Sequence, residues 1–191
     1  MSTSLARKPI PSHAQKVFEG KIFSFWQWEQ ELFDGSKTIF ERISRPDAAF
    51  VLGVLPDKKL LLIEDEQPDR QPIITLPGGG LDKDEAPVRA AERELLEETG
   101  YAAAELTPWY EYSLPGKVSA TFHVFIGKGL EQKKSAEPEP GEKIKLMPMS
   151  FDEFFMMVEK QVDRYSPLRT HVLEMMLDAK KKQEFYELLY G

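Results

Sequence analysis

The chain has 191 residues, of which 41% are hydrophobic, and it carries a formal net charge of −7. This length suits one domain with a sizeable core, and the negative charge disfavours nucleic acid as a partner. The absence of cysteine excludes disulfides and thiolate metal sites, and the absence of a long apolar run or signal peptide predicts a cytoplasmic protein without a membrane span.

The first part of the chain is predicted to form an antiparallel β element. Residues 1–15 are polar and are expected to be a flexible tail. Residues 16–45 contain strand-like runs, and Asp34-Gly35 marks a hairpin turn between two of them. Trp26 and Trp28 are two residues apart, so both side chains are expected on one face of a strand. Residues 46–191 are then predicted to form the main domain.

Strands and helices follow along this main domain. The expected strands cover residues 48–55, 59–64, 73–76, 105–112, 119–128 and 144–149, and the expected helices cover residues 85–99, 151–163 and 167–189. Pro77 and three glycines are expected to form a turn in which the backbone is open to a ligand. Residues 131–143 predict a mobile acidic loop, and Phe154, Met157 and Val158 predict core packing. This mixture of elements indicates an α+β fold.

The expected helix over residues 85–99 has clear boundaries. Pro87 suits its first turn, where a missing N–H costs nothing, and Gly100 suits the left-handed conformation that follows a helix end. Val88, Ala91 and Leu95 are spaced to form one apolar stripe toward a sheet or core. The sequence therefore predicts that one side of this helix is buried.

Acidic residues lie on another side of the same helix. Glu94 and Glu98 are four residues apart and share a face, which Glu97 borders. Their carboxylates repel each other, and this repulsion would be relieved if they coordinated a hard divalent cation such as Mg²⁺ or Mn²⁺. Arg93 is placed to pair with Glu97 or Glu85. A solvated acidic face is the plain alternative, but the register with the glycine turn favours a metal site.

This segment also resembles a known family motif. Gly79, Glu85, Arg93, Glu94, Leu95, Glu97, Glu98, Gly100 and Tyr101 stand at every defined position of the Nudix box. The resemblance implies a Nudix α/β/α sandwich with a mixed sheet and an N-terminal antiparallel β element. Residues 16–45, Arg70, Pro115 and the stretch Glu142-Lys143-Ile144 resemble features of one branch, the ADP-ribose pyrophosphatases and nucleotide-sugar hydrolases.

The resemblance implies metal-dependent hydrolysis of ADP-ribose, or of a related nucleotide sugar, to a nucleoside monophosphate and a sugar phosphate. The implied ligands for Mg²⁺ or Mn²⁺ are Glu94, Glu97, Glu98, the carbonyl of Gly78 or Gly79, and Glu85 in support. The implied catalytic residues are Glu142 or Glu139 as general base, with Glu97 and Arg93. The implied substrate contacts are Arg70, Arg45, Trp28, Trp26, Gly79 and Pro115. The branch also implies a homodimer.

Two positions depart from the pattern of this branch. Many members carry Glu two residues before the Pro that opens the glycine turn, where this chain has Thr75. Many also carry an acidic residue after the later Pro-Gly, where residues 117–121 have none. The alternatives are therefore a Nudix hydrolase of nucleoside triphosphates or dinucleoside polyphosphates, and a non-catalytic sensor of ADP-ribose-like ligands. The N-terminal hairpin argues against the first, and the complete set of box carboxylates argues against the second.

Overall fold

The computed structural model describes residues 8–114, 116–160 and 167–191. Within these ranges the strands are β1 (Gln15–Glu19), β2 (Ser24–Glu31), β3 (Lys37–Ser44), β4 (Ala48–Val54), β5 (Leu60–Gln67), β6 (Arg70–Thr75), β7 (Gly78–Gly80), β8 (Tyr101–Ala102), β9 (Glu105–Ser113), β10 (Val118–Ser119), β11 (Thr121–Lys128), β12 (Glu131–Gln132) and β13 (Lys143–Met149). The helices are α1 (Pro87–Thr99), α2 (Phe151–Lys160), α3 (Pro167–Met176) and α4 (Ala179–Tyr190).

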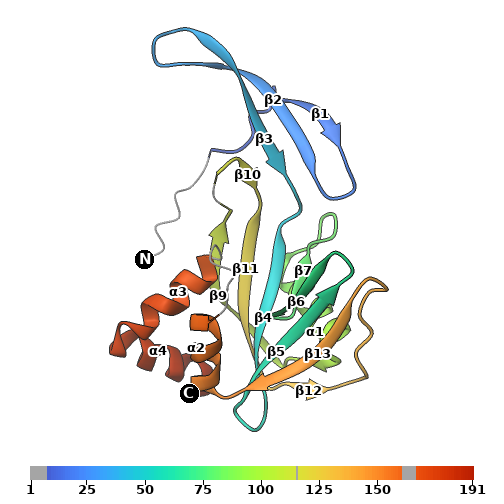
Figure 1. Cartoon of the computed structure of the whole chain (residues 1–191), viewed down its shortest axis with the longest axis vertical. Helices are drawn as coiled ribbons and strands as arrows, with labels where there is room; N and C mark the ends of the chain where they lie inside the picture. The colour runs from blue at the N-terminus through green and yellow to red at the C-terminus, as the bar shows by residue number, and fades with distance from the viewer. Residues whose placement is uncertain (1–7, 115, 161–166) are drawn as a thin grey trace.

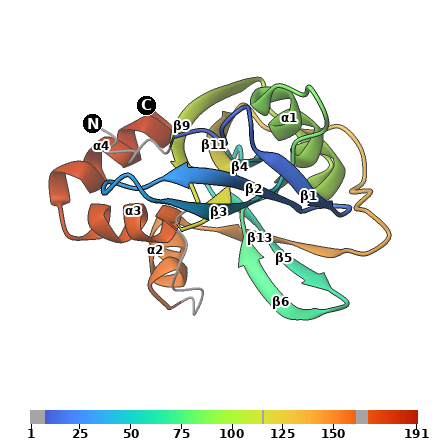
Figure 2. The ribbon, with the colours of Figure 1, turned by 90° about the horizontal axis from the view of Figure 1, so that it is seen from above.

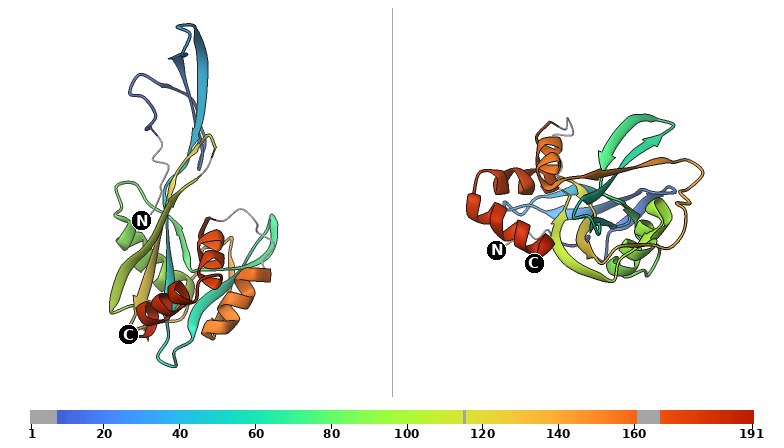
Figure 3. Two further views of the ribbon diagram at one scale, coloured as in Figure 1. Left: turned by 90° about the vertical axis from the view of Figure 1, so that its left-hand side faces the viewer. Right: turned by 90° about the horizontal axis from the view of Figure 1, so that it is seen from below.

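The body of the molecule is a mixed sheet between two layers of helix. Its strand order is β13-β5-β4-β11-β9, with β6 paired to β5 and β7 paired to β4. Strands β4 and β11 are parallel, whereas the other pairs are antiparallel. Helix α1 covers one face and helices α2, α3 and α4 lie on the other, as Figures 2 and 3 show. This arrangement confirms the predicted α+β sandwich with a mixed sheet.

A second sheet projects from one end of this body (Figure 1). It has the order β1-β2-β3-β10, and its three N-terminal strands are antiparallel, as the sequence predicts. The short strand β10 runs parallel to β3, with Val118 opposite Ile43. Strands β3 and β10 then continue into β4 and β11 of the body. The two sheets are therefore connected by two neighbouring stretches of chain.

Two apolar clusters hold the layers together, one on each face of the central sheet. Toward α1, Ala91 and Leu95 pack with Val51 and Leu61 and are fully buried, which confirms the predicted stripe. Toward the other helices, strand residues pack with Phe154 and other side chains of α2, α3 and α4. Successive residues of β5 alternate between the two clusters, so this strand has an almost continuous apolar run.

The helix boundaries differ in two places from the sequence-based expectation. Helix α1 begins at Pro87 rather than Glu85, because Ala86 is extended, with a φ of −74° and a ψ of 142°, as the residue before a proline prefers to be. The single helix predicted over residues 167–189 is two helices. Asp178 caps α4 by accepting hydrogen bonds from two backbone N–H groups, which ends the helical path there. Among the described helices, none is long and apolar enough to cross a membrane.

The glycine segment after Pro77 is a strand and not the predicted turn. Strand β7 pairs with β4, with Gly78 opposite Phe50 and Gly80 opposite Ala48. Gly78 has a φ of +151°, and a Cβ atom there would lie 2.2 Å from the carbonyl oxygen of Ala49. Only glycine permits this close approach, so the segment stays beside β4 instead of turning away.

We predict that Gly78→Ala lowers the free energy of unfolding by about 2 kcal/mol or more, because the added methyl group overlaps the β4 backbone. Gly80→Ala is the matched control in the same strand, since a Cβ atom there meets nothing within 4 Å. Chemical denaturation of both variants measures the difference. Equal stability of the two would contradict the proposed close packing of β7 on β4.

Candidate functional site

Helix α1 is fixed at both ends beside β7. At its start, Pro87 occupies the first turn and Ala86 is the N-cap without a side-chain hydrogen bond. At its end, Gly100 has a φ of +76°, and its N–H donates to the carbonyl of Leu96 at 2.9 Å. The predicted left-handed glycine is therefore confirmed. Because the apolar stripe faces the sheet, the acidic side of the helix lies along the glycine strand.

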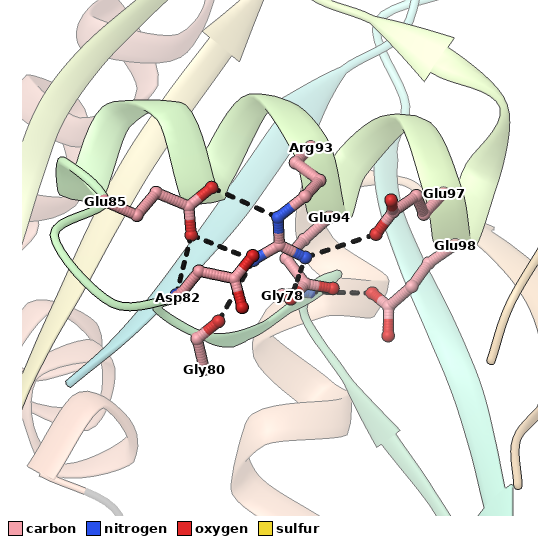
Figure 4. A network of polar contacts seen from close by, with 8 residues as sticks. All are labelled: Gly78, Gly80, Asp82, Glu85, Arg93, Glu94, Glu97 and Glu98. Atoms are coloured by element: carbon pink, nitrogen blue, oxygen red, sulfur yellow. Dashed lines mark hydrogen bonds and ion pairs between the residues drawn. The ribbon is translucent and has the colours of Figure 1, made fainter. Parts of the chain in front are cut away.

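Arg93 connects three carboxylates of this acidic side (Figure 4). Its guanidinium donates to both carboxylate oxygens of Glu85 at 3.1 and 3.0 Å, to Glu94 Oε1 at 2.8 Å and to Glu97 Oε2 at 3.2 Å. It also donates to the carbonyl of Gly80 at 3.1 Å. These bonds raise the pKa of Arg93, with Glu85 as the main cause, and lower the pKa of Glu85. The geometry makes Arg93 an organiser of the carboxylates, and its predicted catalytic role stays a prediction.

Glu98 is the buried member of the set, with only 4% of its surface exposed. Its Oε2 accepts a hydrogen bond from the backbone N–H of Gly78 at 2.7 Å (Figure 4). Burial raises the pKa of Glu98 to about 9, and repulsion from Glu94 and Glu142 contributes to this. At the neighbouring Gly79 a Cβ atom would lie 2.5 Å from Glu94 Oε1, so a side chain there would displace the Glu94 carboxylate. The N–H of Gly78 thus has an observed partner, while its carbonyl as a metal ligand stays a prediction.

Glu142 approaches Glu94 and Glu98 from the other side of the site, and these three residues are called the acidic cluster below. It lies immediately before β13, and burial is the main cause that raises its pKa, followed by repulsion from nearby carboxylates. Its charge in turn raises the pKa of both Glu94 and Glu98. Glu139 is exposed, and its carbonyl accepts the N–H of Glu142 at 2.9 Å. Of the two predicted general bases, Glu142 is therefore the one that the structure brings to the cluster.

Asp65 is a member of this region that the sequence-based reasoning missed. It is 7% exposed, and its charge contributes to the raised pKa of both Glu98 and Glu142. Leu61 lies in the same phase of β5 and packs in the cluster beneath α1, so Asp65 faces α1 as well. The sequence signal that could have revealed Asp65 was an acidic residue at a core-facing position of an otherwise apolar strand.

The predicted substrate contacts are distributed over several places. Arg70 pairs with Asp65 beside the acidic cluster. Arg45 lies in the connection from β3 to β4, where its Nε is buried without a hydrogen-bond partner among the described residues. Trp26 Nε1 donates to Ser44 Oγ, and Trp28 is only 6% exposed and packs against Phe40, so both as substrate contacts stay predictions. Pro115 lies outside the described residues.

The donors in this region suit a hard divalent cation. All of them are carboxylate or backbone oxygens, and Glu94, Glu98 and Glu142 carry raised pKa values that a bound cation would relieve. Within the described residues, however, no group of three or more acidic or histidine side chains is close enough to hold an ion. In this structure the carboxylates of Glu94 and Glu97 instead accept hydrogen bonds from Arg93. Glu94, Glu97, Glu98 and Glu85 as ligands stay a prediction.

The raised pKa of Glu98 predicts a pH-dependent stability of the metal-free protein. Because the folded state holds this proton up to a pKa of about 9 and the unfolded state only to about 4.5, stability falls as pH rises between these values. Glu98→Gln keeps an acceptor for Gly78 and removes the charge. At about pH 8 in a chelator it should melt at least ~2 °C above wild type, or roughly 1 kcal/mol. Glu92→Gln, at an exposed position of α1, is the control, and a less stable Glu98→Gln would contradict the assignment.

Comparison with known proteins agrees with this geometry. The family model described as NUDIX domain matches residues 44–170. The chain is 31% identical to an ADP-ribose pyrophosphatase of Bacillus subtilis (strain 168) over 163 residues, which cover 83% of this chain and 86% of that protein. It is 28% identical to the ADP compounds hydrolase NudE of Escherichia coli (strain K12) over 146 residues, which cover 73% and 77% of the two chains.

A solved structure shows the same fold. The crystal structure of an ADP compounds hydrolase superposes with a TM-score of 0.71 at 24% identity, and the match covers 95% of this chain and 98% of that one. The Nudix box, the sandwich with α1 on one face of the mixed sheet, and the match to the family model all agree. The chain therefore belongs to the Nudix family, and it is a pyrophosphohydrolase of that family.

Proposed function

We propose that the protein hydrolyses the pyrophosphate bond of ADP-ribose, or of a related nucleoside diphosphate sugar, to a nucleoside monophosphate and a sugar phosphate. The observation that carries this proposal is the acidic cluster of Glu94, Glu98 and Glu142, in which burial and mutual repulsion raise the pKa of each carboxyl, so that a bound cation would favour the ionised forms. The substrate class is supported by the relatives named ADP-ribose pyrophosphatase and ADP compounds hydrolase.

We propose Mg²⁺ or Mn²⁺ as the cofactor, held by Glu94, Glu97 and Glu98. When bound, such ions polarise the pyrophosphate and favour the ionised form of a water molecule at neutral pH. The protein's own part begins with Arg93, which fixes the directions of Glu85, Glu94 and Glu97. Strand β7 holds Glu98 in place through Gly78.

Glu142 is the proposed general base. Burial raises the pKa of its carboxyl from that of an ordinary glutamate, which makes it a stronger proton acceptor once ionised. It lies on the segment that contacts the C-terminal part of α1, where the N–H of Glu137 donates to the carbonyl of Glu97 at 2.7 Å. This contact keeps the loop carrying Glu142 near the carboxylates of the helix.

A panel of candidate substrates tests the proposed substrate class. With Mg²⁺ present, ADP-ribose should be hydrolysed to AMP and ribose 5-phosphate faster than nucleoside triphosphates or dinucleoside polyphosphates. Product analysis by chromatography measures the preference. Selective turnover of triphosphates would replace the proposed substrate class. Tight binding of ADP-ribose without any turnover would instead identify the protein as a sensor.

The same assay includes a matched pair of variants. Glu98→Gln should reduce kcat at least ~100-fold while the protein remains folded, because the amide cannot replace a buried anionic oxygen in binding a cation. Glu92→Gln changes an exposed carboxylate of the same helix and should leave kcat within about 2-fold. Near-normal turnover in Glu98→Gln would remove Glu98 from the proposed ligands.

We further propose that residues 16–45 form a dimerisation element beside a main domain of residues 46–191, in a cytoplasmic homodimer. Strands β1, β2 and β3 expose large apolar side chains, among them Phe18 at 56% and Ile39 at 59%. Phe18 and Phe25 touch edge to face with ring centroids 5.8 Å apart. Contiguous apolar surface of this kind is typical of a protein–protein interface.

Replacing this apolar pair tests the dimer. The double variant Phe18→Ser/Phe25→Ser should shift the protein from dimer to monomer, because it removes two exposed rings from the proposed interface. Glu29→Gln, on the same face of β2 as Phe25, should leave the dimer intact. Sedimentation velocity measures the mass in solution. A monomeric wild-type protein, or a dimer that survives the double change, would contradict the proposal.

A further inference from the structure

The hairpin of β5 and β6 has an irregularity beside the acidic cluster. Asp65 is opposite Ile73, whereas Gln67 is opposite Arg70, so the register shifts by one residue between these two pairs. A bulge of this kind bends the strand and changes the direction of nearby side chains. Here it brings the Arg70 side chain back over the strand from which Asp65 projects.

Asp65 binds the Arg70 guanidinium at two points. Arg70 Nη2 donates to Asp65 Oδ2 in a close ion pair, and Arg70 Nη1 donates to the backbone carbonyl of Asp65 at 3.3 Å. The amide of Gln67 approaches the same Oδ2 at 3.5 Å. Because Asp65 is almost fully buried in β5, it gives the longer and more exposed Arg70 side chain a rigid anchor.

The anchored guanidinium lies within the electrostatic reach of the proposed base. The charge of Arg70 lowers the pKa of Glu142, opposing the repulsion from Asp65 and Glu139. Arg93, the other arginine near the cluster, already donates to three carboxylates and to a carbonyl. The Arg70 side chain hydrogen-bonds to Asp65 alone among the described residues, and its Nε makes no hydrogen bond there. Of the two arginines near the cluster, Arg70 is therefore the one with donors left for an anionic substrate.

We propose that Asp65 is a positioning residue that holds the Arg70 guanidinium ready to bind a phosphate oxygen of the substrate. The inference rests on the proposed pyrophosphate substrate and adds to it the residue that orients the cationic contact. An arginine already fixed in direction loses less conformational entropy when the substrate binds. Asp65 contributes through Arg70 and does not itself touch the substrate.

Steady-state kinetics on Asp65→Asn tests this role, with ADP-ribose and saturating Mg²⁺. The amide weakens the charged bond to Arg70, so KM should rise about 10-fold, as expected for a hydrogen bond to a charged group, while kcat changes less than about 3-fold. Glu64→Gln is the matched control. Glu64 is the preceding residue, faces the opposite side of β5 and pairs at 3.4 Å with Lys145. The KM of the Glu64→Gln variant should therefore stay at the wild-type value.

A double-mutant cycle separates positioning from simple packing. Arg70→Ala should raise KM at least as much as Asp65→Asn, and Asp65→Asn should add less than about 2-fold in the Arg70→Ala background. Additive effects on KM, or an unchanged KM in Asp65→Asn, would overturn the proposal. Should Asp65→Asn not fold, Asp65→Glu keeps the charge but moves the carboxylate, and a normal KM in that variant would overturn it equally. Absence of ADP-ribose turnover in the wild type would instead refute the proposed function.

Discussion

The site is organised around a carboxylate that the fold removes from water. Glu98 lies between α1 and β7 with 4% of its surface exposed, and a charge in such a place is costly unless a hydrogen bond compensates it. The N–H of Gly78 supplies that bond, but it reaches Glu98 only because β7 lies directly against β4. Helix packing, the glycine strand and the position of the acidic side of α1 therefore depend on one another.

The remaining charges are divided between two kinds of environment. Glu85, Glu94 and Glu97 share Arg93, so their repulsion is offset within the protein. Glu98 and Glu142 have no ion pair with a described cation, and burial together with repulsion raises the pKa of each. Such an arrangement lowers the stability of the folded chain at neutral pH. The divalent cation proposed above would offset this cost in the bound state.

Much of the architecture follows from local patterns in the sequence. The apolar stripe of α1 and its Gly100 end depend on residues close together in the chain, and both were predicted correctly, whereas the helix begins two residues later than predicted. The glycines after Pro77 depend on a contact between distant residues, since they form a strand because β4 lies beside them. The division of the long C-terminal helix is local, since the Asp178 carboxylate accepts from the N–H groups of Lys180 and Lys181, and the sequence-based reading overlooked this cap.

The candidate site also contains features that the sequence predicted and features that it did not. Spacing along one helix was sufficient to predict the pairing of Arg93 with Glu85 and Glu97. Asp65 was missed because the predicted strand ended at residue 64, whereas β5 continues to Gln67 and places Asp65 opposite Ile73 of β6. Trp28 as a substrate contact stays a prediction, and in the structure cross-strand packing buries its ring, with the ring of Phe40 at 6.0 Å.

The two connections between the sheets have a structural consequence for the candidate site. Strands β3 and β10 are parallel neighbours in the N-terminal sheet, and their continuations β4 and β11 are parallel neighbours in the central sheet. At the junction the N–H of Arg45 donates to the carbonyl of Ser119 at 3.2 Å, and the N–H of Thr121 donates to Asp47 Oδ1 at 2.6 Å. The base of the projecting sheet is therefore hydrogen-bonded across both connections, and β4, one of the strands that they lead into, also pairs with the glycine strand whose Gly78 bonds Glu98.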